Sequence, residues 1–388
     1  MSRRIGVAKF IMLTATAMGA GRFSPAADWS GTLQAALNAA YVTNPRMLAG
    51  VTTSDETGQL VLDGSATAQT ERSQLTVTPQ ILLTRYDRAT DLDSNTGNLG
   101  FHFLQKLERG QWTIDGQGVT DSTVTSELGT TGITYVNRRH NSGSADLGYQ
   151  YFSAERLSWL LQVSAQVTRY SDAAQFGLVN YDYGSVQFGP TWNFSERVQG
   201  SLTFEADRLD PEMSARQHND TVSTQLRRAF SERYAWRVSL GGTRVEYGST
   251  ATSPSSASTT VEYEVGANYA GERLTWDLSA KHAVLPIGIG LLAPETVASL
   301  VVVANTSENG TLTLSLNGRR TDSVFVGPIS VYGGATYGQA SVEWRYHFTT
   351  HWAFSLSYQY ARARAPGVQE WANGNQGKFG IVWDSGRL

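Results

Sequence analysis

The chain has 388 residues, a formal net charge of −3 and 17% charged residues, with 38 glycines, 10 prolines and no cysteine. The balanced charge excludes an electrostatic footprint for nucleic acid, and the missing cysteines exclude a disulfide framework. Length and composition alone do not separate a secreted enzyme from other exported proteins.

The N-terminus has the features of an export signal. Basic residues beginning at Arg3 precede an apolar run over 10–21, and small residues follow up to Ala27. An apolar run of about a dozen residues is too short for a membrane-spanning helix, which needs roughly 20. We therefore predict a signal peptide over 1–27 and a single domain over 28–388.

A repeated segment organises the rest of the chain: a small or polar residue, then Glu, then usually Arg. The copies are Thr70-Glu71-Arg72, Leu107-Glu108-Arg109, Ala154-Glu155-Arg156, Ser195-Glu196-Arg197, Ser231-Glu232-Arg233, Gly271-Glu272-Arg273, Ser307-Glu308-Asn309 and, with different residues, Thr349-Thr350-His351. Their even spacing predicts repeated units of about 40 residues.

Apolar and polar residues alternate with period two on both sides of each copy, which is typical of β-strands with two different faces. After Ser231-Glu232-Arg233, for example, Tyr234, Trp236 and Val238 alternate with polar or small residues. The predicted strands are 29–42, 59–69, 74–86, 98–107, 111–120, 139–152, 157–170, 181–194, 198–208, 219–230, 234–247, 258–269, 274–284, 297–306, 311–321, 335–348, 352–362 and 372–383. A miscounted hairpin would leave 16 strands instead of 18.

The connections alternate between tight Glu-Arg turns and longer loops, such as 121–138, 248–257 and 285–296. Strands of about ten residues, short turns at one end and long loops at the other are typical of barrels in the outer membrane. The expected fold is therefore all-β, a transmembrane antiparallel up-and-down β-barrel. A soluble propeller or sandwich is the rival, but it does not explain an apolar outer face opposite a small, polar inner face. Pro79 and Pro190 interrupt predicted strands, and we expect bulges there.

Aromatic residues gather beside the tight turns and are expected to form a ring at one membrane interface. They are Tyr149, Tyr151, Trp159, Trp192, Phe194, Phe230, Tyr234, Trp236, Tyr269, Trp276, Trp344, Tyr346, Phe348, Trp352 and Phe354.

The signal peptide, the Glu-Arg hairpins and the last strand, with Phe379, Ile381 and Trp383 alternating, resemble bacterial outer-membrane β-barrel porin families. Some members of these families are linked to exopolysaccharide gene clusters. The chain departs from the family habit of ending on an aromatic residue, because 384–388 continue past Trp383. The resemblance implies the outer membrane of a Gram-negative bacterium, with its lipid, its lipopolysaccharide and its assembly machinery as partners.

The face opposite to the apolar one should line the lumen, and its charges are mixed. They are Lys106, Asp115, Asp146, Glu205, Asp207, Arg227, Arg237, Glu262, Glu264, Asp277, Lys281, Arg319, Glu343 and Arg345. These charges either pair across strands and stiffen the wall or set the selectivity of a water-filled pore. No Arg or Lys ring dominates, which argues against a conduit for a polyanion.

The sequence shows no catalytic or metal-binding constellation, and we expect no cofactor. Little chain precedes the first strand, so we expect no plug domain, and 121–138 is the candidate for a loop folded into the lumen. The leading hypothesis is a passive channel for small hydrophilic solutes or saccharides, with exopolysaccharide export as one setting. A non-conducting structural or adhesive barrel is the alternative, and a membrane lipase comes third. The oligomeric state stays open.

Overall fold

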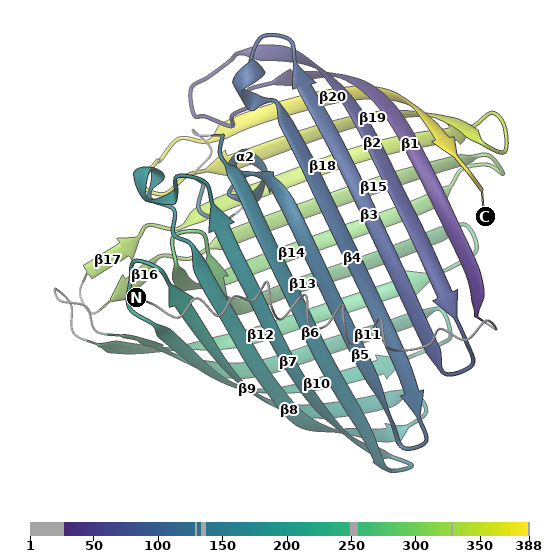
Figure 1. Ribbon diagram of the computed structural model, residues 1–388, viewed down its shortest axis with the longest axis vertical. Coiled ribbons are helices and arrows are strands. Elements are labelled where there is room, and N and C mark those ends of the chain that lie inside the picture. The colour runs from purple at the N-terminus through teal and green to yellow at the C-terminus, as the bar shows by residue number, and fades with distance from the viewer. Residues whose placement is uncertain (1–26, 129, 133–136, 249–254, 327–328, 387–388) are drawn as a thin grey trace.

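A single antiparallel sheet of 18 strands closes on itself to form a barrel (Figure 1). The computed structural model describes residues 27–128, 130–132, 137–248, 255–326 and 329–386, so the predicted signal peptide lies almost wholly outside the described residues. Every strand pairs with its neighbours along the chain, and β1 pairs with β20 from Gln34↔Asp384 to Val42↔Gln376. This last pairing leaves the sheet without an edge.

The barrel strands are β1 (Asp28–Thr43), β2 (Ser54–Gln69), β3 (Ser73–Tyr86), β4 (Ser94–Leu107), β5 (Gly110–Ser122), β6 (Arg139–Ala154), β7 (Leu157–Tyr170), β8 (Tyr181–Ser195), β9 (Val198–Pro211), β10 (Gln217–Ala229), β11 (Tyr234–Tyr247), β12 (Ser256–Ala270), β13 (Leu274–Ile287), β14 (Leu291–Asn305), β15 (Gly310–Thr321), β18 (Ala335–His347), β19 (Trp352–Arg364) and β20 (Ala372–Asp384). The loops carry the short elements η1 (Thr90–Leu92), α2 (Thr123–Ser126), η2 (Ala173–Phe176), β16 (Val324–Val326) and β17 (Ile329–Tyr332). Figure 1 shows α2, β16 and β17 at the end opposite to the tight turns.

The fold class and the count of 18 barrel strands are confirmed, with three differences of detail. The predicted loop 285–296 is wrong. Strand β13 continues to Ile287 and β14 already begins at Leu291, so only a three-residue turn connects them. The hairpin β16–β17 was not predicted. The bulges expected at Pro79 and Pro190 are also wrong. Pairing toward one neighbouring strand is interrupted beside each proline, and it resumes without a change of register.

In four of the eight tight turns, the first residue of the sequence repeat stabilises the turn. The hydroxyl of Ser231 accepts hydrogen bonds from the backbone N–H groups of Arg233 and Tyr234, at 3.2 and 3.1 Å. Thr70 and Ser195 do the same in their turns. Thr349 does so in the divergent eighth copy. A Ser or Thr side chain that satisfies two backbone donors is a compact way to reverse the chain.

The outer surface of the barrel is apolar. Leu37, Leu240 and Leu356 are each more than half exposed, and exposed Leu, Val, Phe and Tyr side chains occur on nearly every barrel strand. In water this surface would be unfavourable, whereas hydrocarbon accepts it provided that every backbone group is paired. The closed sheet meets that condition, so the barrel spans a membrane.

The two faces of β11 can be tested by placing the same charge on adjacent residues. Leu240 points outward at mid-strand and Ser239 points into the lumen. We expect Leu240→Arg to lower the free energy of unfolding by about 2–4 kcal/mol, the cost of arginine on the lipid face at the bilayer midplane. Ser239→Arg should cost much less. Urea titration of barrels refolded in lipid vesicles, read by the mobility difference between heated and unheated samples, measures both. Equal losses for the two variants would contradict the assignment of faces.

Candidate functional site

The lumen face carries all 14 of the charged residues that we expected to point inward. Strand register places each of them opposite to the exposed apolar side chains of its strand. The same register adds Asp63, Glu295 and Lys378 to this face. The alternation along the last strand would have found Lys378, because it directly precedes the outward Phe379, whereas Glu295 was hidden in the wrongly predicted loop.

Part of this charge is paired across or along the wall. Arg237 Nε lies 2.6 Å from Glu264 Oε1, and Arg345 Nη2 lies 3.3 Å from Glu343 Oε1. Arg319 pairs with Glu295 through two nitrogens, and Asp115 bonds His102 at 2.6 Å. Within the described part of the chain, Lys106, Arg227, Asp277 and Lys281 form no ion pair. The pairing interpretation therefore holds for some of the inward charges, and a role of the others in selectivity stays a prediction.

The 15 aromatic residues lie beside the tight turns, on the outward face of their strands or within the turns themselves. Several touch across neighbouring strands, such as Tyr269 and Trp276 with ring centres 6.3 Å apart and Trp344 and Phe354 at 5.3 Å. Their contribution to membrane anchoring stays a prediction.

A segment of the loop between β5 and β6 crosses the lumen near the loop end. We call residues 123–128 and 130–132 the lumen segment. The hydroxyl groups of Thr321 on β15 and Tyr332 on β17 donate to the carbonyl of Thr130, at 3.1 and 2.8 Å. A Cβ atom on Gly132 would lie 3.4 Å from that of Ala365, in the loop after β19. The segment thus leaves one wall and contacts the opposite one, and its position agrees with the expectation that 121–138 folds inward.

Glu127 holds the lumen segment from inside. Its side chain is buried, and its carboxylate accepts hydrogen bonds from Tyr170 Oη at 2.6 Å and from the hydroxyls of Thr130 and Thr131 at 2.7 and 2.8 Å. A Cβ atom on Gly288 would come within 2.5 Å of this carboxylate, so glycine gives it room. A buried carboxylate is tolerated only when hydrogen-bonded, and here both oxygens are. Nothing in the sequence marked Glu127.

Tyr332 belongs to the same network. Burial raises the pKa of the Tyr332 phenol, and the negative charge of Glu127 raises it further, while Arg319 acts in the opposite direction. The phenol therefore stays protonated and serves as the donor to Thr130.

The tip of the β13–β14 hairpin also folds into the barrel. The side-chain amide of Gln217 on β10 donates to the carbonyl of Gly290 at 2.8 Å and accepts from the N–H of Leu292 at 2.7 Å. Tyr247 on β11 donates to the carbonyl of Leu292 at 3.1 Å. Gly290 has a φ of +73°, and a Cβ atom there would lie 2.8 Å from Val179. Only glycine fits this close turn.

Apolar side chains fill the space under the tip. The buried cluster is Tyr181, Leu209, Val245, Tyr247, Val284, Ile287, Leu292, Ala293, Val324, Tyr332 and Ala335. Leu209 and Val245 point inward by register, so near the loop end apolar side chains replace part of the polar lumen face. Together, the lumen segment and this cluster narrow the barrel at that end.

Below the narrowing, the wall is hydrophilic and hollowed. A cavity of about 410 Å³ lies between β7 and β13. Its polar lining is Gln187, Thr191, Gln199, Ser201, Thr203, Glu205, Thr221, Ser223, Gln225, Ser239, Glu262, Glu264, Lys281 and His282. Amides, hydroxyls and separated charges of both signs suit a hydroxyl-rich solute better than an apolar one.

No group of three His, Asp or Glu side chains among the described residues could hold a metal ion. The structure also describes no helix that is long and apolar enough to cross a membrane.

Comparison with known proteins gives likeness of fold alone. No family model matches the sequence, and no curated protein matches it. Among solved structures, OccAB3 of Acinetobacter baumannii is 9% identical with a TM-score of 0.45, covering 93% of this chain and 100% of that one. The outer membrane protein opdK of Pseudomonas aeruginosa is 11% identical with a TM-score of 0.43, covering 93% and 99%. The FrpB iron transporter of Neisseria meningitidis (F3-3 variant) is 7% identical with a TM-score of 0.44, and the match covers 87% of this chain but 62% of FrpB.

The class of protein follows from the molecule itself. A closed antiparallel sheet with an apolar exterior, a polar lumen, tight turns at one end and long loops at the other is a β-barrel of the bacterial outer membrane.

The position of the lumen segment can be tested by cross-linking, since the chain contains no cysteine. We expect Gly132→Cys with Ala365→Cys to form a disulfide on mild oxidation. The Cβ atoms would be 3.4 Å apart, close to the roughly 3.5–4.5 Å of natural disulfides. Gel mobility with and without reductant reports the bond. The pair Gly118→Cys with Ala365→Cys is the control, because Gly118 lies on the outer face of β5, and the absence of a bond in both pairs would place the segment elsewhere.

Proposed function

We propose that this barrel is a channel for small hydrophilic solutes or for neutral to weakly charged saccharides, narrowed near its loop end by the lumen segment. The observation that carries the proposal is the combination of a polar cavity in the wall with a hydrogen-bonded segment across the lumen above it. Inward-folded loops and charged wall residues are the features by which pores select solutes.

Saccharides are the first solutes to test. The cavity offers amide and hydroxyl groups that can bond sugar hydroxyls in either direction, and its charges are of mixed sign. The resemblance to barrels of exopolysaccharide gene clusters points the same way. A role in exopolysaccharide export is therefore part of the proposal, for a neutral or weakly charged polymer rather than a polyanion.

A non-conducting barrel whose loops bind partners is the second candidate. It is favoured by the buried apolar cluster, which occupies the loop end of the lumen between β8 and β18. Single-channel recording separates the two candidates, since only the channel passes ions.

Purified barrel in planar bilayers should give discrete conductance steps, and liposomes containing it should admit mono- and oligosaccharides but exclude large dextrans. Ion flow is the minimal property of a water-filled lumen. If protein shown to be folded by its heat-dependent gel mobility gives no conductance and admits no sugar, the result favours the non-conducting candidate.

Removing the central carboxylate tests which element limits the flow. Glu127→Ala leaves the hydroxyls of Tyr170, Thr130 and Thr131 without their shared acceptor, so the lumen segment loses its bond to Tyr170 on the wall and keeps those from Thr321 and Tyr332. We expect mean conductance to rise about twofold or more as the constriction loosens. Glu108→Ala, in an exposed tight turn at the other end, is the matched control and should leave conductance unchanged. An unchanged value for Glu127→Ala would mean that the segment does not limit flow.

A further inference from the structure

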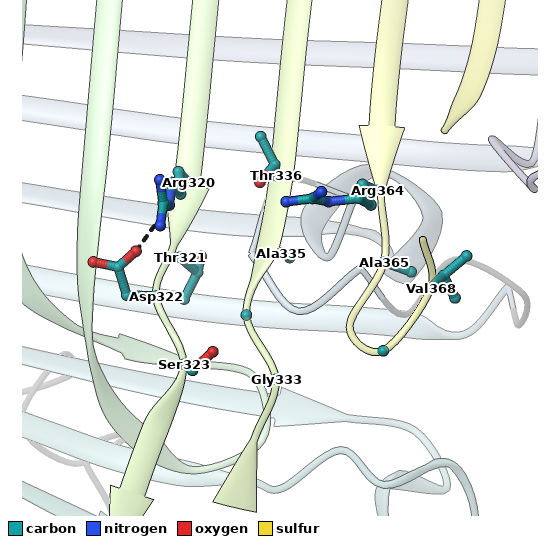
Figure 2. A pocket seen from close by; sticks show the side chains of 12 residues that line it. Arg320, Thr321, Asp322, Ser323, Gly333, Ala335, Thr336, Arg364, Ala365 and Val368 are labelled. Atoms are coloured by element: carbon teal, nitrogen blue, oxygen red, sulfur yellow. Dashed lines mark ion pairs between the residues drawn. The ribbon is translucent and has the colours of Figure 1, made fainter. Parts of the chain in front are cut away.

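Three arginines gather on the outer face of the barrel at its loop end. Arg320 is on β15, Arg362 and Arg364 are on β19, and all three are exposed and point away from the lumen. Strand β18 lies between β15 and β19, and its Thr336 stands directly opposite Arg320 on one neighbour and Arg364 on the other in the strand register. We call Arg320, Arg362 and Arg364 the rim arginines. Figure 2 shows Arg320 and Arg364 on either side of Thr336, with the guanidinium of Arg364 directed toward β18.

Two of the rim arginines, Arg320 and Arg364, border a pocket. A pocket of about 220 Å³ lies among the ends of β15, β18 and β19 (Figure 2), and Arg320, Thr336 and Arg364 are part of its lining. Ser323 and Gly334 line it as well. The pocket has the size for a phosphate together with part of the group that carries it. Its lining is polar, and its charged residues are Arg320, Arg364 and Asp322, which pairs with Arg320.

Two of these arginines differ from the others at the same height. Outward arginines on other strands at this height lack one of two features. Arg85 and Arg139 form no ion pair among the described residues but also stack on no described aromatic ring. Arg169 and Arg244 have an acidic partner, Asp182 at 2.6 Å and Glu246 at 2.7 Å. Arg320 also has one, Asp322 at 2.9 Å.

Arg362 and Arg364, by contrast, form no ion pair with any described residue, and their guanidinium carbons lie 4.1 and 5.1 Å from the centre of the Trp371 ring. Stacking on an aromatic ring holds a guanidinium in place while leaving its N–H donors free for an anion.

Their depth along β19 places them at a membrane interface. Trp352, beside a tight turn, and Arg362 are ten residues apart on the same outward face. Ten residues at roughly 3.4 Å and a tilt of about 40° correspond to roughly 26 Å along the membrane normal, against an apolar band of about 25 Å. Just inside this level, Tyr358 and Tyr360 donate to Asn375 and Asn373, at 2.6 and 3.0 Å, so the surface is already turning polar.

We propose that the rim arginines bind the phosphorylated saccharide headgroup of a lipid in the outer leaflet, which in this membrane is lipopolysaccharide. Long loops face the outside of the cell in such barrels, so this rim meets the outer leaflet. Arginine binds phosphate through two parallel N–H bonds, and the apolar strands directly below accept the acyl chains. The proposal rests on the orientation of the barrel and not on whether it conducts.

Binding of defined lipids to the purified, folded, full-length barrel tests the proposal, with native mass spectrometry counting bound lipid against concentration. The probes are bisphosphorylated lipid A, the same lipid without its phosphates, and inorganic phosphate alone. We expect wild-type protein to bind the bisphosphorylated lipid, and R362Q/R364Q to bind it at least about tenfold more weakly. R244Q, which alters an ion-paired arginine at the same height, should bind as wild type does.

The other outcomes each decide against the proposal. Equal binding of the lipid with and without phosphates would show that only the acyl chains are recognised. Binding of inorganic phosphate with the same affinity would make this a site for a soluble anion. Wild-type affinity in R362Q/R364Q would place any lipid site elsewhere. The comparison of lipids on wild-type protein needs no variant, so it decides the question even if the double variant fails to fold.

Discussion

The pairing of β1 with β20 is the interaction on which the rest of the molecule depends. Hydrocarbon offers no hydrogen-bond partner, and each unpaired backbone group in it costs several kcal/mol. Closure of the sheet gives the backbone groups of every barrel strand a partner, and it also determines where the strands end and which way their side chains face. An even number of strands puts both ends of the sheet at the tight-turn side. The period of two along each strand separates a lipid face from a lumen face without further information.

The need for a closed barrel in lipid explains why so much of the fold could be predicted from the sequence. A strand that meets lipid on one side and water on the other must alternate, so its length and its faces follow from local composition. The Ser or Thr that opens most tight turns is a local device as well, and Thr349 fills the same role in the one copy that lacks Glu and Arg. The alternation along each strand was enough to assign the inward charges to the lumen face, as Glu205 and Arg237 illustrate.

The constriction could not be predicted in the same way, because its residues obey contacts between distant parts of the chain. Glu127 is an ordinary loop residue until Tyr170 and Gly288 are brought beside it. The β13–β14 tip has too little polar alternation to be recognised as strand, since its apolar side chains pack inside the barrel instead of facing lipid. Leu209 and Val245 reverse the expected polarity of the lumen face for the same reason.

The two inward elements are held by different forces, and this bears on which of them can move. The β13–β14 tip packs on buried apolar side chains, so its departure would expose that surface to water. The lumen segment is held mainly by hydrogen bonds from Tyr170, Thr321 and Tyr332. Water in the lumen can replace such bonds at a net cost of only about 0.5–1.5 kcal/mol each, or about 1.5–3 where a charged group takes part. If the lumen adjusts to a solute, the lumen segment is therefore the element to yield, while the tip and its cluster keep the loop end of the barrel in shape.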